Sequence, residues 1–461
     1  MMITSRLTAL LVACSILFAP AASFAQTRTP RAAARIDRRA LAAQVRAEFL
    51  HAWRGYEQYA WGHDELRPLS KTHHDWYEQP LYMTPVDALD TLILMGFDAE
   101  AAKTRAFIVN NLSFDKDISV QVFEITIRHL GALLACYQLT GDRRLLALAT
   151  DLGTRLLPAF NSKTGIPYRF VNLKTGQVRE DVTNPAEAGT LLIEFGTLSK
   201  LTHKPIFYDK AKRALVEVFQ RRSSIGLVGS RINVETGAWT SKSSHISGGI
   251  DSYYEYLLKC WLLFDDQDCK RMWLESVAAI NKYLADDTSA ELWYGRADML
   301  TGQRTGTTYG ALDAFMPAVL ALGGDLKRAA RLQASGFKMW QANGIEPERL
   351  NYRTMKVDSP GYPLRPEIIE STYYLQHYTH DPHYLQMGAT FFNSFVRYCR
   401  TDTAYAALKD VTTKEQADDM ESFLFAETFK YFYLLFAPPK TLDFKRVIFN
   451  TEAHPIRKTW K

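Results

Sequence analysis

Apolar positions along the chain recur at helical spacing and are interrupted by short polar turns. An aromatic or leucine-rich run ends at each turn, and an amphipathic run leaves it, which is the pattern of two paired helices. After the first interval the turns lie about sixty residues apart, a longer period than that of the common short helical repeats. The pattern predicts seven helix pairs, with weak or shortened outer partners at the ends. The turns fall near Gly96, Gly141, His203, Asp265, Gly324, His380 and Pro438.

Helix pairs in sequence either stack as an open superhelix or close into a double-ring α/α barrel. The acidic residues favour closure, because carboxylates at equivalent positions of equivalent helices converge at one end of a ring. The first helix of nearly every pair carries such a residue ahead of its turn: Asp87, Glu124, Glu187, Asp251, Glu367 and Glu427. Alternating segments at 165–171, 230–234 and 446–449 predict short hairpins in the loops.

The run Ser119–Asp142 predicts a helix that is apolar on nearly every side and therefore buried. Glu124 and Arg128 interrupt it with i,i+4 spacing, which places both side chains on one face. An ordinary ion pair within the helix is the structural alternative. The apolar surroundings favour a cavity, because an ionised carboxylate in a core is unfavourable by several kcal/mol unless a partner or water receives it.

Other acidic residues occupy similar settings. Asp251 follows a glycine pair at a helix start, where a capping role worth about 1 kcal/mol is the alternative. Glu367 and Glu370 share one face of a helix that begins after Pro366, although the helix dipole alone favours acids there. Glu427 lies in the final apolar helix, whereas His454 is expected to be structural.

Carboxylates around an aromatic pocket are what glycosidic cleavage needs, since one acid protonates the leaving oxygen and another activates water. Other chemistries find little support, because the chain has no P-loop, GxGxxG, HExxH or GxSxG motif. The segment His73–Asp75 resembles a metal-binding fragment, but neighbouring side chains point apart and we interpret it as a loop.

Composition and charge narrow the possible partners. The chain has 461 residues, of which 47% are hydrophobic, so it can bury a large core. Its net charge of +5 comes from well-mixed acids and bases, which argues against nucleic acid or a charged membrane surface as the partner. No segment after the N-terminal region has eighteen unbroken apolar residues, so no membrane span is expected.

The N-terminal region predicts export. Residues 1–25 have the features of a signal peptide, with Arg6, an apolar run and small residues before a cleavage site after Ala25, which implies a periplasmic or secreted protein. A lipoprotein box ending at Cys14 is a minor alternative. Residues 26–35 are expected to be a disordered lead, and residues 36–461 a single catalytic domain.

Four cysteines follow the predicted cleavage site, too few for a disulfide scaffold. Buried free thiols are the common state in apolar helices. A bridge between Cys260 and Cys269 across a helix turn is possible.

Seven motifs in order resemble the class I α-mannosidases, glycoside hydrolase family 47, from about Ala52 to Pro455. They are AWRGYEQYAWGHDEL, VDALDTLILMG, FEITIRHLGALL, GGIDSYYEYLLK, LRPEIIESTYYL, MESFLFAETFKY and FNTEAHP. The resemblance implies an (α/α)7 barrel with a C-terminal β-hairpin plugging one end. It also implies a Ca²⁺-dependent, inverting, exo-acting α-1,2-mannosidase that acts on mannose-containing oligosaccharides.

The resemblance also assigns roles to residues. Glu124 would be the general acid, acting through a water, Glu367 the general base and Asp251 a further essential carboxylate, the last two being hard to separate. Thr451 would hold Ca²⁺, whose preference for hard oxygen ligands suits such a site. The residues that would line the same sugar subsite are Arg128, Glu187, Arg365, Glu370, Phe423, Glu427 and Glu452.

The chain departs from the family pattern at one segment. The family often has HLxCF on the fifth inner helix, whereas this chain has Ala311 to Phe315 in the order ALDAF, without the histidine and the cysteine. The signal of bacterial style and the lack of an anchor suggest a bacterial, monomeric member that trims scavenged oligosaccharides. The alternatives are a catalytically silent mannose-glycan binding protein on the same barrel and a helical scaffold without a site.

Overall fold

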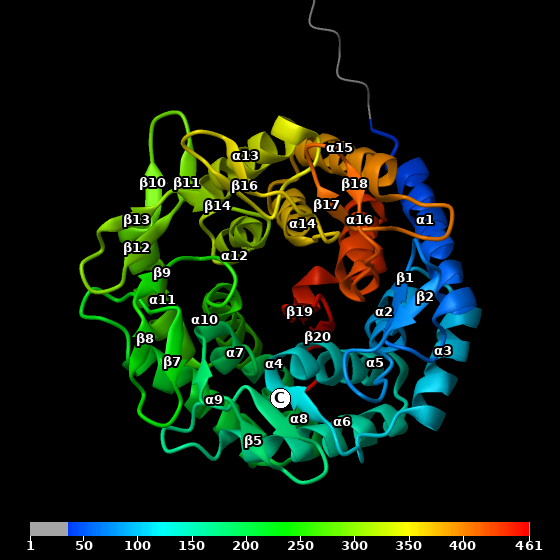
Figure 1. Ribbon diagram of the computed structural model, residues 1–461, viewed down its shortest axis with the longest axis horizontal. Coiled ribbons are helices and arrows are strands. Elements are labelled where there is room, and N and C mark those ends of the chain that lie inside the picture. Colours follow the sequence, from blue (N-terminus) through cyan, green and yellow to red (C-terminus); the bar gives the residue numbers. More distant parts are fainter. Residues whose placement is uncertain (1–35, 461) are drawn as a thin grey trace, which may run out of the picture. The chain divides into compact units, whose positions relative to one another are not determined.

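Two concentric rings of helices make up the computed structural model, which describes residues 36–460 (Figure 1). The predicted signal peptide and the predicted lead both lie outside the described residues. The inner ring is formed by α2 (Met83–Leu94), α4 and α5 (Val122–Ile125 and Gly131–Thr140), α7 and α8 (Pro185–Gly189 and Leu192–Thr202), α10 (Asp251–Phe264), α12 (Met316–Leu322), α14 (Glu367–Thr379) and α16 (Phe429–Phe436). The outer ring is formed by α1 (Arg38–Tyr59), α3 (Asp98–Asn111), α6 (Arg143–Leu156), α9 (Pro205–Gln220), α11 (Gln267–Tyr283), α13 (Leu326–Asn343) and α15 (Pro382–Cys399).

Each inner helix except the last packs against the outer helix that comes next in the chain, and the last, α16, packs against α1, which closes the barrel. Helix α1 covers α16, where the ring centroids of Phe49 and Phe429 are 5.7 Å apart, and Phe49 also lies 5.3 Å from Phe425 in the turn before α16. Arg38 donates to the carbonyl oxygen of Ala437 over 2.9 Å. The fold is therefore the predicted (α/α)7 barrel, and the outer partner of its last inner helix comes from the start of the domain.

The turns that end the inner helices lie where the sequence predicts them. The C-cap residues Gly141, His203, Asp265 and His380 all adopt left-handed backbone conformations, with φ of 74°, 57°, 57° and 57°. A left-handed residue satisfies the last carbonyl groups of a helix and turns the chain toward the next helix. These turns set the antiparallel packing of each pair.

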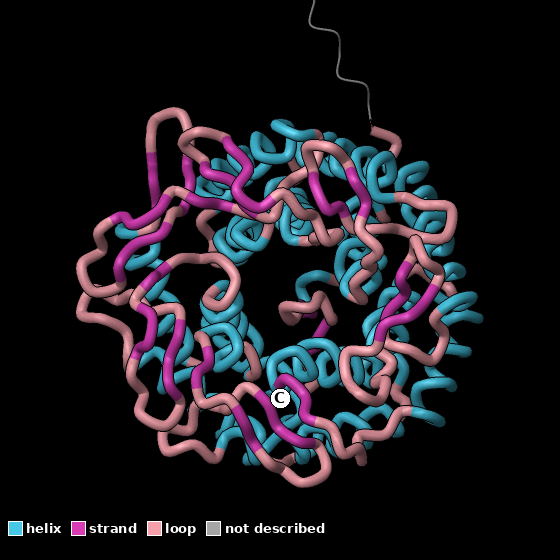
Figure 2. Tube along the Cα trace, viewed as in Figure 1, coloured by secondary structure: helices cyan, strands magenta, loops and turns pink. Residues whose placement is uncertain are grey.

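Small antiparallel sheets connect each helix pair to the next, and Figure 2 shows them spread around the ring. In each three-stranded sheet, the strand that precedes an inner helix pairs with a strand that follows the outer helix of the same helix pair. The three-stranded sheets are β3 (Ser119–Gln121), β4 (Phe170–Asn172) and β5 (Val178–Arg179); β6 (Val182–Thr183), β7 (Arg231–Asn233) and β8 (Trp239–Ser241); β9 (Ser243–Ser244), β12 (Arg296–Asp298) and β13 (Arg304–Gly306); and β14 (Thr308–Tyr309), β15 (Arg349–Asn351) and β16 (Lys356–Ser359). The two-stranded sheets are β1 (Glu65–Arg67) and β2 (Thr72–His74), β10 (Ala285–Asp287) and β11 (Leu292–Tyr294), and β17 (Leu408–Asp410) and β18 (Glu415–Gln416).

The C-terminal hairpin occupies the middle of the ring (Figure 1). Its strands are β19 (Val447–Phe449) and β20 (Pro455–Arg457), which pair with Ile448 opposite Ile456. Strand β20 contacts α5 and β19 contacts α10, so the hairpin touches two separate helices of the inner ring. The predicted plug is present, and its turn faces the barrel axis.

The predicted helix Ser119–Asp142 is wrong at its start. Ser119–Gln121 form strand β3 and the helix begins at Val122, because Val120 pairs with Val171 in the neighbouring loop sheet. The helix also contains a π-helical turn, η1 (Thr126–Leu130). Pairing with a distant strand outweighs the local helical period, which the sequence pattern of this segment alone does not reveal.

Two further findings concern the cysteines and the membrane. A disulfide joins Cys260 at the end of α10 to Cys269 in α11, whereas Cys136 and Cys399 are buried thiols. Within residues 36–460, none of the helices has the length and apolar character needed to cross a bilayer.

Candidate active site

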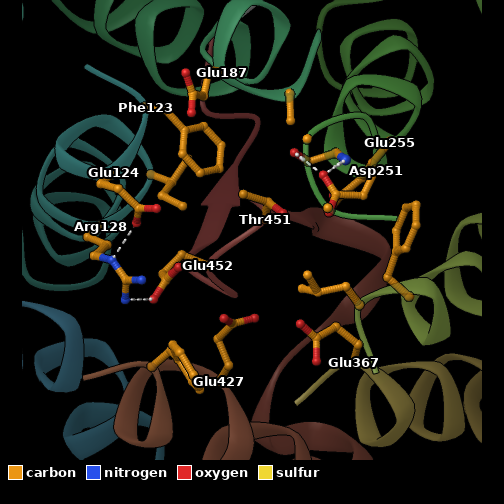
Figure 3. Close-up of a pocket in the computed structure, with 18 of the residues that line it drawn as sticks. Phe123, Glu124, Arg128, Glu187, Asp251, Glu255, Glu367, Glu427, Thr451 and Glu452 are labelled. Carbon is orange, nitrogen blue, oxygen red and sulfur yellow. Dashed lines mark hydrogen bonds and ion pairs between the residues drawn. The ribbon is translucent and has the colours of Figure 1, made fainter. Parts of the chain in front are cut away.

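A cavity of about 330 Å³ opens on the barrel axis above the C-terminal hairpin. Every residue that the sequence assigns to the site lines it: Glu124, Arg128, Glu187, Asp251, Arg365, Glu367, Glu370, Phe423, Glu427, Thr451 and Glu452. Figure 3 shows Glu124 and Arg128 on one side, Asp251 and Glu367 on the other, and Thr451 between them. The wall therefore concentrates carboxylates, with Arg128 and Arg365 as the cations that line it.

Arg128 organises one wall of the cavity. Its Nε donates to Oε2 of Glu124 over 3.0 Å, and its Nη1 donates to Oε1 of Glu452 over 2.6 Å. The guanidinium carbon lies 5.0 Å from the ring centroid of Trp76 and 5.7 Å from that of Phe423. Glu124 therefore lines the cavity, as expected, and the ion pair with Arg128 that was the structural alternative is present as well.

Two π-helical turns aim side chains into this cavity. The turn η1 carries Arg128, and the turn η4 (Leu424–Thr428), which begins the final inner helix, carries Glu427. A π-turn adds a residue to the helix and rotates the next turns about the helix axis, and such turns concentrate at functional sites. Arg128 lies in such a turn, and Glu452 of the hairpin accepts its hydrogen bond.

Helix α10 contributes Asp251 and Glu255. Asp251 is the first residue of the helix, and its Oδ1 accepts a hydrogen bond from the backbone N–H of Ser252 over 2.8 Å. Burial raises the pKa of Asp251 to about 7, with Glu255 and Glu367 adding to the rise. Glu255 pairs with Lys259 one turn further on.

Glu367 begins α14 opposite Glu124 (Figure 3). Its Oε2 is buried and has no hydrogen-bond partner among the described residues, and Arg365 Nη1 lies 3.9 Å from its Oε1. Burial raises the pKa of Glu367 to about 7 and Arg365 opposes the rise. A buried polar atom without a partner needs an explanation, and a bound substrate or water would supply the missing partner.

The remaining carboxylates crowd the base of the cavity. Burial raises the pKa values of Glu370 and Glu452 to about 8, although Lys259 opposes the first shift and Arg128 the second. The pKa of Glu427 is also raised by burial and by its acidic neighbours. Glu187 differs, because Arg169 donates to both of its oxygens. Burial therefore disfavours the ionised forms of these carboxylates, and a cation bound at the base would stabilise them.

The hairpin turn carries Thr451 and is held firmly. Asn450 donates to the carbonyl oxygen of Ile127 and to Oε1 of Glu194, each over 2.8 Å. The N–H of Thr451 donates to the hydroxyl of Tyr256 over 3.3 Å. The hydroxyl and carbonyl of Thr451 and the surrounding carboxylates are all hard oxygen donors, a set that fits a calcium ion.

His454 and Asp87 lie beneath the site. His454 Nδ1 is 2.7 Å from Asp90 and its Nε2 is 3.4 Å from Asp87. Burial would lower the pKa of His454, but the two carboxylates raise it overall. His454 is structural, as predicted. The prediction that Asp87 faces the ring interior with the other acids is wrong, because Asp87 is fully buried behind Arg128.

The position of Asp87 has a simple geometric cause. It lies nine residues before its turn, whereas the acids of this set that line the cavity lie eleven to seventeen residues before theirs: Glu124, Glu187, Asp251, Glu367 and Glu427. An α-helix rises 1.5 Å per residue, so Asp87 sits several ångströms further from the open end of the ring.

Several residues that line the cavity were not predicted from the sequence. Glu255 is four residues after Asp251 on the same helix face, a spacing that could have identified it. Gln121 at the end of β3, Phe123 in α4 and Asn184 just before α7 also line the cavity, and their positions depend on the sheets that precede these helices. At the departing segment, Leu312 and Phe315 line the wall and Ala311 is buried beside them.

The chain is similar to a known protein family and to named relatives over most of its length. The family model described as glycosyl hydrolase family 47 matches residues 48–458. The chain is 37% identical over 451 residues to "Alpha-mannosidase I MNS5" of Arabidopsis thaliana, which covers 92% of this chain and 78% of the relative. It is 34% identical over 443 residues to "Mannosyl-oligosaccharide 1,2-alpha-mannosidase MNS1" of the same plant, covering 90% and 78%.

A solved structure agrees with these relatives. The α-1,2-mannosidase from Trichoderma reesei superposes with a TM-score of 0.83 at 28% identity, covering 91% of this chain and 99% of that one. These relatives are plant and fungal proteins, so they leave the bacterial origin that the sequence suggests as a prediction.

Proposed function

The chain belongs to glycosyl hydrolase family 47, and from this premise we propose that its central cavity hydrolyses terminal α-1,2-linked mannose from oligosaccharides. The observation that carries the proposal is the set of carboxylates around one cavity, with Glu124 facing Asp251 and Glu367 across Thr451 (Figure 3). The relatives named as α-1,2-mannosidases support the linkage.

The shape of the cavity favours exo action. The hairpin closes the barrel from below, and a volume of about 330 Å³ is at the small end of ligand sites. A pocket closed at its base admits the end of a chain and excludes its middle. The terminal sugar would enter first and stop above Thr451.

The catalytic roles correspond to the two sides of the cavity. Glu124 would act as the general acid on the leaving oxygen through a water, and Glu367 would activate the attacking water, with Asp251 as a further essential carboxylate. An inverting enzyme needs its acid and base roughly 6.5–9.5 Å apart to leave room for that water. The unpartnered Oε2 of Glu367 is available to accept the water's proton.

Calcium would be held by the hydroxyl and carbonyl of Thr451 and by waters that the carboxylates at the base orient. When bound, the ion supplies positive charge and coordination sites for sugar hydroxyls. The residues of the chain do the rest: Arg128 holds Glu124 and Glu452 in place, and Phe423 offers an apolar face beside them.

The proposal is tested with mannobioses of different linkage and one matched pair of variants. We expect release of free mannose from the α-1,2 disaccharide and little from the α-1,3 or α-1,6 disaccharide. Glu124→Gln should lower kcat by about 10²–10⁴-fold because it removes general acid catalysis. Glu78→Gln, which removes an exposed carboxylate, should leave kcat unchanged. Equal turnover by the two variants would contradict the role of Glu124.

The protein would act outside the cytoplasm as a monomer, in the periplasm or the medium, where it would trim mannose oligosaccharides taken from the surroundings. The support is the apolar run after Arg6 and the small residues up to Ala25. Mass spectrometry of the exported protein would show a new N-terminus at Gln26, and an intact Met1 would contradict export by cleavage.

A further inference from the structure

Three side chains come together at the rim of the barrel, away from the sugar cavity: His63, His73 and Asp75. His63 precedes strand β1, whereas His73 lies on β2 and Asp75 directly follows it. The rings of His63 and His73 stack with centroids 3.4 Å apart, and Nδ1 of His63 is 2.9 Å from Oδ2 of Asp75. One ligand atom from each residue lies within 4.8 Å of the other two.

From this cluster we propose that the protein has a second metal site, which binds a zinc-class transition metal ion through His63, His73 and Asp75. Two imidazoles and one carboxylate, with water in a fourth position, are a ligand set that suits Zn²⁺. Ligand atoms at bond lengths of about 2.0–2.1 Å from a tetrahedral ion lie about 3.3 Å apart. The three ligand atoms already lie within 4.8 Å of one another, and the exposed His73 side chain has room to rotate toward the other two ligands.

Two of the three ligands are held in place before any ion binds. The hydroxyl of Tyr56 donates to the carbonyl oxygen of His63 over 2.7 Å and fixes its backbone. The N–H of Asp64 donates to Oδ1 of Asp75 over 2.9 Å and orients the carboxylate. Hydrogen bonds that orient metal ligands in this way strengthen metal binding. The side chains of His63 and Asp75 are 34% and 22% exposed, so an ion and a water can reach them.

The strand alternation provides a matched control next to the site. His73 and His74 are neighbours on β2, and their side chains point to opposite faces of the hairpin. His73 stacks on His63, whereas His74 does not belong to the cluster. The sequence-based interpretation of His73–Asp75 as a loop is wrong for His73 and His74, which lie on strand β2. His63 was not predicted, because pairing of β1 with β2 brings it close only in the folded chain.

An ion bound at this site would affect the chain segment that follows Asp75. Asp75 is followed by Trp76, whose ring lies against the guanidinium of Arg128, and by Tyr77, whose hydroxyl accepts from the N–H of Gln121. An ion bound to Asp75 would therefore fix the segment that packs behind the cavity wall. It would stabilise the rim and would take no part in the chemistry at Glu124.

The test is metal titration of the tag-free protein in excess Ca²⁺, which as a hard ion does not compete for imidazoles. We expect one equivalent of Zn²⁺ to bind by calorimetry and raise the melting temperature, and one equivalent of Co²⁺ to give the visible absorption of tetrahedral coordination. His63→Ala and His73→Ala should each weaken binding at least about tenfold, and His74→Ala should not.

Several results would overturn the proposal. One is the absence of both the Zn²⁺ heat and the Co²⁺ spectrum. Another is binding by His63→Ala and His73→Ala that equals binding by the unaltered chain. Equal weakening by His74→Ala would place the ion elsewhere. Because Ca²⁺ is present throughout, none of these results depends on the sugar site, and hydrolysis of α-1,2-mannobiose by the same samples reports on that site separately.

Discussion

Nη1 of Arg128 donates to Oε1 of Glu452 over 2.6 Å, joining the second inner helix to the C-terminal hairpin across 324 positions of sequence. Both side chains are almost fully buried. The same guanidinium holds Glu124, so one cation ties the proposed general acid to the plug that closes the barrel. The floor of the site and its catalytic wall are therefore one structural unit.

Arg128→Ala should destabilise the fold and abolish activity together. It leaves Glu124 and Glu452 without their shared cation in a buried site, and removing one member of a buried ion pair is unfavourable by about 3–5 kcal/mol. Denaturant unfolding measures the loss. Arg144→Ala, which removes an exposed arginine paired with Asp142, is the control and should hardly change the free energy of unfolding. Equal effects of the two substitutions would contradict the role given to Arg128.

Gly131→Ala tests how closely the plug fits the inner ring. A Cβ at Gly131 would lie 2.5 Å from Nδ2 of Asn450 and 3.0 Å from Cδ2 of His454, so the hairpin must move. Overpacking of this kind is unfavourable by about 1–3 kcal/mol, and a displaced Thr451 should also lower activity. Thermal unfolding and kcat/KM measure the two effects.

Gly336→Ala on the outer helix α13 is the control for that substitution. Its Cβ would meet Cδ1 of Ile368 at 3.5 Å, an ordinary contact, and alanine favours a helix. We expect an unchanged or raised melting temperature and full activity. A Gly131→Ala protein as stable and active as Gly336→Ala would mean that the hairpin position does not matter.

The buried carboxylates predict how stability depends on pH without calcium. Burial raises the pKa of Asp251 from 3.8 and of Glu367 from 4.5, each to about 7, so between these values the folded protein binds more protons than the unfolded chain. The contribution of these two groups to the free energy of unfolding is therefore fully present below about pH 4 and is lost as the pH rises through 7. In chelator, the free energy of unfolding should drop by at least about 1 kcal/mol from pH 5 to pH 8.

Two comparisons isolate the cause of that drop. Glu367→Gln cannot ionise, so its stability should fall less steeply over the same range. Added Ca²⁺ should reduce the drop in the unaltered protein, since a cation offsets the charge of the carboxylates. A free energy of unfolding that rises from pH 5 to pH 8 in chelator would contradict the account.

Thr451→Val tests the calcium proposal, because it keeps the shape of the side chain and removes its hydroxyl oxygen. Binding to the native state alone stabilises it by about 2.7 kcal/mol at one hundred times the dissociation constant. The unaltered protein should therefore melt at a higher temperature in Ca²⁺ than in chelator. Thr451→Val should lose most of that difference, whereas Thr459→Val, near the end of the same chain segment, should keep it. Equal shifts in both variants would place calcium elsewhere.

Much of the fold could be predicted from the sequence because it depends on local signals. Helical period, apolar runs and the turn residues Gly141, His203, Asp265 and His380 define the helix pairs. The closure of the ring by α1 and α16 could not be predicted in the same way. It depends on packing between Phe49 and Phe429, residues that no local pattern connects.

The candidate site, like the fold, combines features that local sequence signals predict with features that depend on tertiary contacts. Isolated acids in apolar helices, such as Glu124 and Glu427, point to a cavity because burying them otherwise is unfavourable. The depth of Asp87, the π-turns and the approach of His63 to His73 arise only when distant segments meet. Such features depend on tertiary contacts, which a single sequence does not display.

The central claim is that this cavity cleaves α-1,2-linked mannose with inversion and needs calcium to do so. Proton NMR of the protein with α-1,2-mannobiose tests it most directly, because the anomeric signals of the first product report the stereochemistry. We predict initial release of β-mannose in Ca²⁺ and its arrest by chelator. Initial release of α-mannose, or no release in Ca²⁺, would contradict the account.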